Sequence, residues 1–264
     1  MRASSSALGI GTLLLAGCVS SSFNLATHQL DYTITSTAKE VELGRAIAQK
    51  VEARFPVLAD ETVQNRVRAI GGRIAAVCER QEVVYHFAVL DDETVNAFSL
   101  PGGYVYVHRG LIEQTGSDDE LAGVIAHEVA HIAARHAVKR LEGHLGAQLA
   151  SLAALVTRQG EASQGVNVAL QAAQLAYARQ DELKADRLAV RYLQVAGFDP
   201  TAMLTFLETL HRLPPEGKTP RYLPRGVVRP QYALTHPFVP ERLRAVKEAL
   251  FGVADYVDYL NTPD

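Results

Sequence analysis

The sequence predicts an α+β fold that is mostly helical and contains one small β-sheet. Capping boxes followed by apolar residues at helical spacing mark several helices along the chain. Short runs rich in β-branched and aromatic residues mark strands, and all of them fall within residues 83–107. The hydrophobic content of 48% is enough for a large core. The net charge of −3 gives no support for nucleic-acid binding.

The N-terminal segment is typical of a bacterial lipoprotein. Residues 7–16 form an apolar run that is too short to span a bilayer but suits a signal peptide. The run ends in Leu15-Ala16-Gly17-Cys18, which resembles a lipoprotein signal-peptidase box. We therefore expect residues 1–17 to be removed, Cys18 to carry lipid, and residues 18–36 to act as a tether. An ordinary secretory signal or an uncleaved anchor is the alternative.

A single domain is expected over residues 37–264, beginning with two helices. Thr37-Ala38-Lys39-Glu40 is a capping box that opens a helix to about residue 54, and Asp60 can cap a second helix to about residue 79. Cys78 has no intramolecular partner if Cys18 carries lipid, and it is interpreted as a small buried apolar residue. Strands are expected over 83–90, 95–99 and 104–107, with a turn at Pro101-Gly102-Gly103.

The central helix is expected to begin at Ser117, the N-cap of a further capping box that has Glu120 at its third helical position. Neither Gly nor Pro occurs from Ala126 to Leu141, so the helix is expected to be continuous there. A long Pro-rich loop is expected over residues 213–239. Further helices are expected over residues 141–159, 163–196, from 199 to about 213, and from 238 or 240 to 250.

The central helix carries His127-Glu128-Val129-Ala130-His131. Residues four apart lie on the same face of a helix, so His127 and His131 can offer two imidazole nitrogens to one metal ion. Glu128 lies beside the first of them, where a carboxylate can take a proton from a metal-activated water. The motif predicts a metallopeptidase site if a third ligand exists.

The third ligand separates classes of zinc peptidase. One class adds a His six residues after the second, with a Gly midway, but here those positions hold Ala137 and Ala134. Another class takes a Glu from a later helix, with an Asp four residues beyond it, and Glu182 and Asp186 fit this pattern. Glu182 can then ligate zinc, while Asp186 accepts a hydrogen bond from a ligand His. A solvated acidic helix face is the alternative for this pair.

Several linked motifs extend this pattern: residues 96–103 (NAFSLPGG), the HExxH sequence, Arg179-x-x-Glu182-x-x-Ala185-Asp186, and Thr235-His236-Pro237 followed by Arg242. Through them the chain, from about residue 42 to about residue 242, resembles the HtpX-type zinc metallopeptidases, especially their periplasmic BepA- and LoiP-like lipoprotein branch. The family often has Ser before that Arg, where this chain has Ala178. The resemblance implies a zincin-like fold with one Zn²⁺ per chain, ligated by His127, His131 and Glu182. It also implies Glu128 as general base, with Asp186 and Arg242 supporting the ligands.

The resemblance implies roles for two further segments. Asn96, Ala97 and Phe98 are expected to hold the substrate backbone as an added strand, with an ordinary hairpin as the alternative. His236 is expected near the zinc, either filling the open position and keeping the enzyme latent or stabilising the oxyanion. Capping of the following helix is the other interpretation of His236. The remaining histidines considered, His108, His136, His144 and His211, are interpreted as structural or exposed.

Together these features predict a zinc-dependent endopeptidase of the bacterial envelope, an outer-membrane lipoprotein that faces the periplasm. Its expected substrates are unfolded or misfolded envelope proteins, because only an unfolded segment can supply a free strand. Two other classes stay open. One is a chaperone-like outer-membrane assembly factor with latent protease activity, associated with the assembly machinery. The other is a hydrolase that acts on a non-peptide amide.

Overall fold

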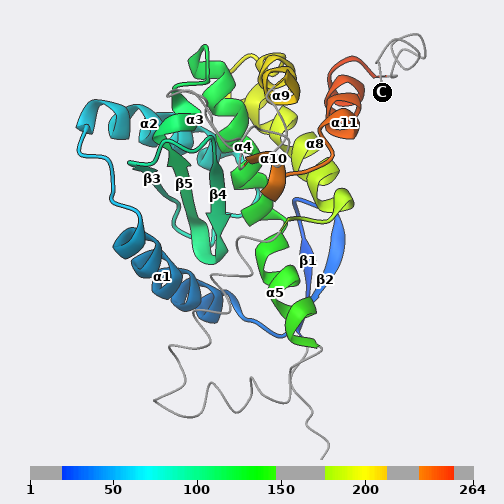
Figure 1. Ribbon diagram of the computed structural model, residues 1–264. Coiled ribbons are helices and arrows are strands. Elements are labelled where there is room, and N and C mark those ends of the chain that lie inside the picture. The colour runs from blue at the N-terminus through cyan, green and yellow to red at the C-terminus, as the bar shows by residue number, and fades with distance from the viewer. Residues whose placement is uncertain (1–19, 147–175, 213–231, 253–264) are drawn as a thin grey trace, which may run out of the picture.

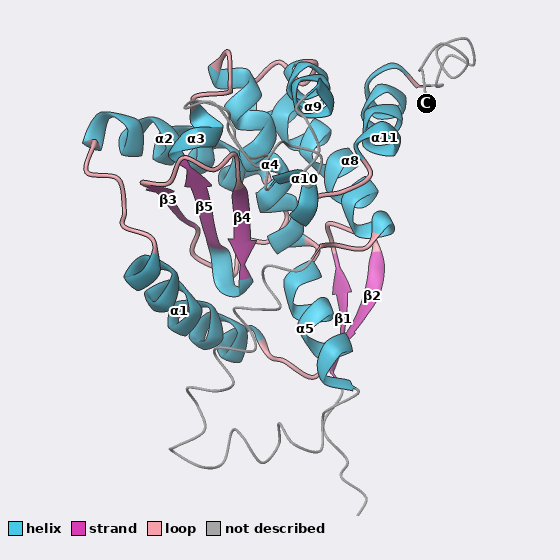
Figure 2. Cartoon of the chain, viewed as in Figure 1, coloured by secondary structure: helices cyan, strands magenta, loops and turns pink. Residues whose placement is uncertain are grey.

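The computed structural model describes residues 20–146, 176–212 and 232–252 (Figure 1). Helices surround one central helix, and a small sheet lies on one side of it (Figure 2). The prediction of a mostly helical α+β fold is confirmed. Within these residues, no helix has the length and apolar character needed to span a bilayer.

The first two long helices begin at polar capping residues. Helix α1 (Thr37–Arg54) starts one residue earlier than predicted, since the Ser36 hydroxyl accepts a hydrogen bond from the Lys39 amide. Helix α2 (Glu61–Val77) starts as predicted, with the Asp60 carboxylate accepting from the amides of Thr62 and Val63. Cys78 follows α2 and is buried, as expected.

A three-stranded sheet has the order β3 (His86–Leu90), β5 (Tyr104–His108) and β4 (Ala97–Leu100). Strands β3 and β5 are parallel, and β4 runs antiparallel to β5 with Ala97 opposite Val107. A short 3₁₀ turn, η1 (Pro101–Gly103), joins β4 to β5, and Gly102 adopts a left-handed φ of 77° there. Strand β4 is an edge of the sheet and packs beside α4.

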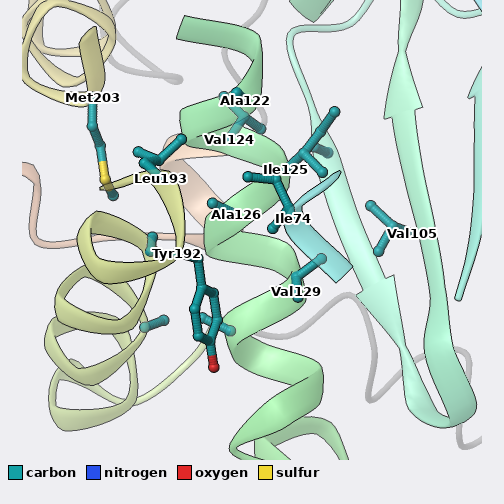
Figure 3. Close-up of a cluster of buried hydrophobic side chains, with 14 of the residues drawn as sticks. Ile74, Val105, Ala122, Val124, Ile125, Ala126, Val129, Tyr192, Leu193 and Met203 are labelled. Carbon is teal, nitrogen blue, oxygen red and sulfur yellow. The ribbon is translucent and has the colours of Figure 1, made fainter. Parts of the chain in front are cut away.

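Helix α4 (Asp118–Ala133) forms the centre of the core. The Ser117 hydroxyl caps it by accepting from the Glu120 amide, as predicted. It follows the one-turn helix α3 (Arg109–Ile112). Every residue from 121 to 136 is buried. Figure 3 shows α4 between the sheet, which contributes Val105, and a later helix, which contributes Tyr192 and Leu193. This burial holds the HExxH residues in fixed positions.

The remaining helices follow α4 in the chain. They are α5 (His136–Gly146), α8 (Arg179–Ala196), α9 (Ala202–Arg212), α10 (Tyr232–Thr235) and α11 (Val239–Phe251). Residues 147–175 and 213–231, which include much of two predicted helices and the predicted long loop, lie outside the described residues. Residues 176–178 are not helical, so the described part of the predicted 163–196 helix begins only at Arg179.

The prediction of a continuous helix through residues 126–141 is wrong. Helix α4 ends at Ala133, Arg135 has a left-handed φ of 57°, and α5 begins at His136. Side chains satisfy the carbonyls that the break leaves open: Asn24 donates to the Ala133 carbonyl at 3.1 Å, and Lys139 donates to the Ala134 carbonyl at 2.8 Å. Tertiary contacts therefore end this helix, in a stretch with no local breaker.

The N-terminal residues differ from the expected tether. Residues 20–33 form an antiparallel hairpin of β1 (Ser20–Asn24) and β2 (Gln29–Thr33). Two of its polar side chains, Asp31 and Thr33, are buried against the domain, where Asp31 pairs with Lys139 at 2.6 Å. Its large apolar side chains are exposed: Phe23, Leu30 and Tyr32. Residues 19–36 are rich in Ser and Thr, which favoured a tether, but Gln29–Thr33 alternate polar and apolar residues with the period of a strand.

A buried ionic cluster joins the hairpin, α1, the β4–β5 turn and the end of α4. Its centre is Glu40, which is 1% exposed and accepts two hydrogen bonds from Arg80, at 2.7 and 2.9 Å. Arg135 donates to the same carboxylate at 3.1 Å, and so does the Gly102 amide. Arg135 also donates to the hydroxyl of Thr33 at 3.0 Å. Glu40 therefore serves this cluster, in place of the capping role that its sequence position predicted.

We predict that Glu40→Gln destabilises the protein strongly, because it leaves two buried guanidinium groups without their shared negative charge. The free energy of unfolding in urea should fall by about 3–5 kcal/mol. Glu61→Gln is the matched control, since the Glu61–Arg68 pair is exposed and should contribute less than about 1 kcal/mol. Equal losses in the two variants would contradict a central role for Glu40.

Candidate metal centre

Four side chains from three parts of the chain meet in the core beside α4. His127 and His131 project from α4, Glu182 comes from the first turn of α8, and His236 follows α10. One nitrogen or oxygen of each lies within 4.8 Å of those of the other three. Each of these residues is at most 1% exposed. The three predicted ligands, His127, His131 and Glu182, are therefore brought together in one buried cluster.

The two imidazoles present the same kind of nitrogen to Glu182. The Nε2 atoms of His127 and His131 are 3.0 Å apart, which their spacing of four residues on one helix face permits. The two Glu182 oxygens each lie 3.4 Å from one of these nitrogens. The arrangement offers two nitrogens and a carboxylate to one ion, which is the donor set of many catalytic metal sites.

Asp186 lies one turn beyond Glu182 on α8 and fixes the orientation of His127. Its Oδ1 is 2.8 Å from the Nδ1 of His127, so a proton on that nitrogen leaves the lone pair of Nε2 free for a metal. Arg242 from α11 donates to both oxygens of Asp186, at 2.8 and 2.9 Å. Burial raises the pKa of Asp186, but the charge of Arg242 outweighs it and holds that pKa below its usual value.

Glu128 directly follows His127 on α4 and is fully buried. Neither of its carboxylate oxygens has a hydrogen-bond partner among the described residues. The His236 ring lies beside it, with its Nε2 3.3 Å from Oε1, a contact that lacks hydrogen-bond geometry. A buried carboxylate without partners is costly in a purely structural role, which favours a chemical one.

The charges of this site fit a bound divalent cation. Three buried carboxylates, Glu128, Glu182 and Asp186, face one buried guanidinium, that of Arg242. An uncompensated excess of buried negative charge is strongly unfavourable, and a cation offsets it. Burial and the charge of Arg242 act to lower the pKa of His127, but Asp186 and Glu182 outweigh them and raise it to about 9. The surroundings of His127 thus favour positive charge at its ring, whether from a proton or from a metal.

His131 is held as a neutral ring between two aromatic neighbours. Burial lowers its pKa to about 4, which keeps a lone pair available for a metal. Tyr177 stacks on it with ring centroids 3.8 Å apart, and the guanidinium of Arg140 lies over the other side of that tyrosine. His136 contacts the edge of His131. No sequence pattern pointed to Tyr177, and His136 was interpreted as structural or exposed.

His236 reaches the centre from the segment that follows α10. Its Nδ1 lies 3.3 Å from the Nε2 of His127 and 3.2 Å from Oε1 of Glu182. Tyr232 stacks on the His236 ring with centroids 4.3 Å apart, and the Tyr232 amide donates to the Val95 carbonyl at 2.9 Å. The position of Tyr232 near the Thr-His-Pro motif was the only signal in the sequence that could have indicated it.

The residues predicted to contact substrate lie at the edge of the sheet. Asn96 precedes β4, and Ala97 and Phe98 begin it. The Asn96 and Ala97 side chains are buried, while Phe98 is half-buried and stacks on Tyr106. The Thr235 hydroxyl approaches the side-chain oxygen of Asn96 at 3.5 Å, so the His236 segment lies beside the start of this strand.

Comparison with known proteins identifies relatives of the region that builds this centre. The model of peptidase family M48 matches residues 61–250. The beta-barrel assembly-enhancing protease of Escherichia coli strain K12 is 28% identical over 218 residues, covering 79% of this chain and 43% of that protein. The mitochondrial metalloendopeptidase OMA1 of Schizosaccharomyces pombe is 32% identical over 181 residues, covering 67% and 50% respectively. The chain thus spans less than half of the bacterial relative.

We predict that Glu182→Ala loses metal, because among the described residues it removes the one carboxylate placed within 3.4 Å of both Nε2 atoms. Elemental analysis of the purified variant should find much less bound divalent metal than in the wild type. Glu128→Gln is the matched control and should retain metal, since Glu128 is outside the ligand cluster. Full retention of metal in Glu182→Ala would exclude Glu182 as a ligand.

Proposed function

Because this chain belongs to peptidase family M48 and is a metalloendopeptidase, we propose that it is a zinc-dependent protease of unfolded or misfolded bacterial envelope proteins. The observation that carries the proposal is the buried cluster of His127, His131 and Glu182 with Glu128 beside it. His127, His131 and Glu182 would hold the zinc, and a site with three protein ligands would leave room for water or substrate. Zinc bound there would polarise the scissile carbonyl as a Lewis acid and lower the pKa of the attacking water.

The protein's own contribution to the reaction centres on Glu128. A carboxylate whose oxygens accept no hydrogen bond from described residues is free to take a proton from the water that attacks the peptide carbonyl. The same carboxylate then delivers that proton to the leaving amine. Asp186 holds His127 in one tautomer throughout, and Arg242 keeps Asp186 ionised.

Strand β4 is the proposed site of substrate binding. Its edge position leaves one side of the strand unpaired by the described sheet, so an extended peptide can add there through main-chain hydrogen bonds. The burial of the Asn96 and Ala97 side chains favours recognition of the backbone rather than of particular substrate side chains. Strand addition selects segments that are not folded, which supports the assignment to protein quality control.

His236 is proposed to hold the protease in a latent state. Its ring lies among the proposed ligands and within 3.3 Å of the general base, so it occupies the space that substrate and water need. The segment that carries it also bonds to Val95, just before β4. Displacement of one segment would therefore expose both the metal and the substrate strand. This closed arrangement also favours the second candidate function, a chaperone-like assembly factor whose proteolysis is latent.

The location and partners are proposed from the sequence and the relatives. The Leu15-Ala16-Gly17-Cys18 box supports a lipid anchor at Cys18, which is outside the described residues. The name of the bacterial relative, a beta-barrel assembly-enhancing protease, supports a place in the envelope near outer-membrane assembly. We therefore propose an outer-membrane lipoprotein that faces the periplasm and cleaves envelope proteins that fail to fold.

We predict that Glu128→Gln abolishes cleavage of unfolded casein while metal remains bound. The amide has nearly the shape of the carboxylate but is no base, so the rate should fall by a factor of about 10² or more. The assay compares wild type and variant at equal metal content, with and without a chelator. Turnover at the wild-type rate would refute this mechanism.

We predict that His236→Ala raises basal cleavage of casein, because it frees the space beside the three remaining ligands. Metal content should not change. If His236 instead stabilises the oxyanion, the same change should lower the rate by a factor of about 10². The sign of the change therefore decides between the two roles, and an unchanged rate would exclude both.

We predict that labelled palmitate is incorporated into the wild type and not into Cys18→Ala. Only a lipidated N-terminal cysteine accounts for that difference, since Cys78 is buried. Cys78→Ala is the matched control and should be labelled as the wild type is. A wild type that remains unlabelled and is released with the periplasmic fraction would exclude the anchor.

A further inference from the structure

A further histidine, His136, contacts the centre from outside the cluster of His127, His131, Glu182 and His236. The Nδ1 of His136 lies 2.9 Å from the Nδ1 of His131, and His136 is 1% exposed. The described mechanism makes no use of His136. A buried imidazole in direct hydrogen-bond contact with a proposed ligand nevertheless has the position of a residue that controls the ligand.

The direction of this hydrogen bond follows from the chemistry of the ring. A neutral imidazole carries one proton, and its other nitrogen is an acceptor. The Nε2 of His131 faces His127 and Glu182, so a ligand role requires its lone pair to be free. The His131 proton is then on Nδ1, which donates to the Nδ1 of His136. The proton of His136 is then on its own Nε2, which lies 3.4 Å from Oδ1 of Asp181 but has no hydrogen-bond partner among the described residues.

The break between α4 and α5 makes this contact possible. Side chains five positions apart on a continuous helix point in different directions, so His131 and His136 could not meet there. They meet because Arg135 turns the chain with a φ of 57°. A left-handed conformation costs a residue other than Gly roughly 1–2 kcal/mol, and such strain often accompanies a functional constraint.

The strained residue is held by its own side chain. Arg135 donates to Glu40 at 3.1 Å, to the Thr33 hydroxyl at 3.0 Å and to the Thr35 carbonyl at 2.7 Å. These three contacts come from the N-terminal hairpin, the loop after it and α1. The ionic cluster around Glu40 thus fixes the backbone turn that places His136 against His131.

We propose that His136 is a positioning residue for the metal centre, which accepts a hydrogen bond from His131 and orients its Nε2 toward the metal. His136 thereby does for His131 what Asp186 does for His127. One ligand is oriented by a carboxylate on α8, and the other by an imidazole that the Arg135 turn brings into reach. This inference rests on the proposed role of His131 as a ligand.

The test uses variants that distinguish the hydrogen-bond acceptor of His136 from the volume of its ring. His136→Phe keeps a planar ring but removes the acceptor, whereas His136→Asn keeps an acceptor oxygen near the position of Nδ1 and removes the ring. Zinc affinity is measured by competition with a chromophoric chelator. Visible absorption of the cobalt-substituted protein reports ligand geometry independently of activity.

The proposal expects zinc binding about 10- to 100-fold weaker in His136→Phe and an altered cobalt spectrum. His136→Asn should stay within about 3-fold of the wild type, because the hydrogen bond to His131 is retained. A packing role predicts the reverse order, with Phe tolerated and Asn weakened. That order, wild-type affinity in both variants, or equal loss in both would each overturn the proposal.

Two controls complete the experiment. His136→Leu is a second variant without an acceptor, and it replaces His136→Phe if thermal unfolding shows that the larger ring prevents folding. His131→Ala in the same competition assay tests the ligand assignment itself. Retained zinc affinity in His131→Ala would show that the proposed centre is wrong, independently of any result for His136.

Discussion

The excess of buried carboxylate beside α4 is the constraint on which the rest of the structure depends. Glu128, Glu182 and Asp186 are all fully buried, and each charge removed from water costs several kcal/mol after relaxation. Packing elsewhere must offset that cost. The apolar surface of α4, which is buried from residue 121 onward against the sheet and α8, is the main contributor. Arg242 on α11 contacts two of these carboxylates, Asp186 and Glu182, so α11 is connected to the centre as well.

The members of the centre differ in how firmly the fold holds them. His127, His131 and Glu182 project from long helices, and a buried side chain contacts the Nδ1 atom of each histidine. His236 follows a helix of only four residues and depends on stacking with Tyr232 and a few backbone hydrogen bonds. A fixed set of ligands combined with one less firmly held side chain is the arrangement expected of a centre that must stay assembled while access to it changes.

Features that depend on local interactions could be predicted from the sequence. The starts of α2 and α4 follow from Asp60 and Ser117, whose side chains bond to amides two or three residues away. The HExxH spacing and the Glu182–Asp186 spacing place side chains on one face of a helix wherever the helix lies. The meeting of α4 and α8 could be predicted only through the resemblance to a family, because no local pattern specifies it.

Features that depend on distant residues could not be predicted. Arg135, at the α4–α5 break, bonds to Glu40, which is 95 positions before it, and the sequence around Arg135 contains neither Gly nor Pro. The proposed role of His136 could not be predicted for the same reason, since in a continuous helix its side chain would point away from His131. The sequence predicted a capping role for Glu40, because its position fits a capping box. Its carboxylate instead binds two arginines that lie far along the chain.

The N-terminal hairpin limits the reach of the proposed lipid anchor at Cys18. Asn24 bonds to the end of the catalytic helix, and Glu142 accepts from the Ile34 and Thr35 amides, so the hairpin is part of the domain. Only Val19 separates Cys18 from Ser20, where β1 begins, and three residues span at most about 10 Å. If Cys18 is acylated, the short connection to β1 would hold the domain close to the lipid surface. Such a protease would cleave substrates near the membrane and would not reach those in the rest of the periplasm.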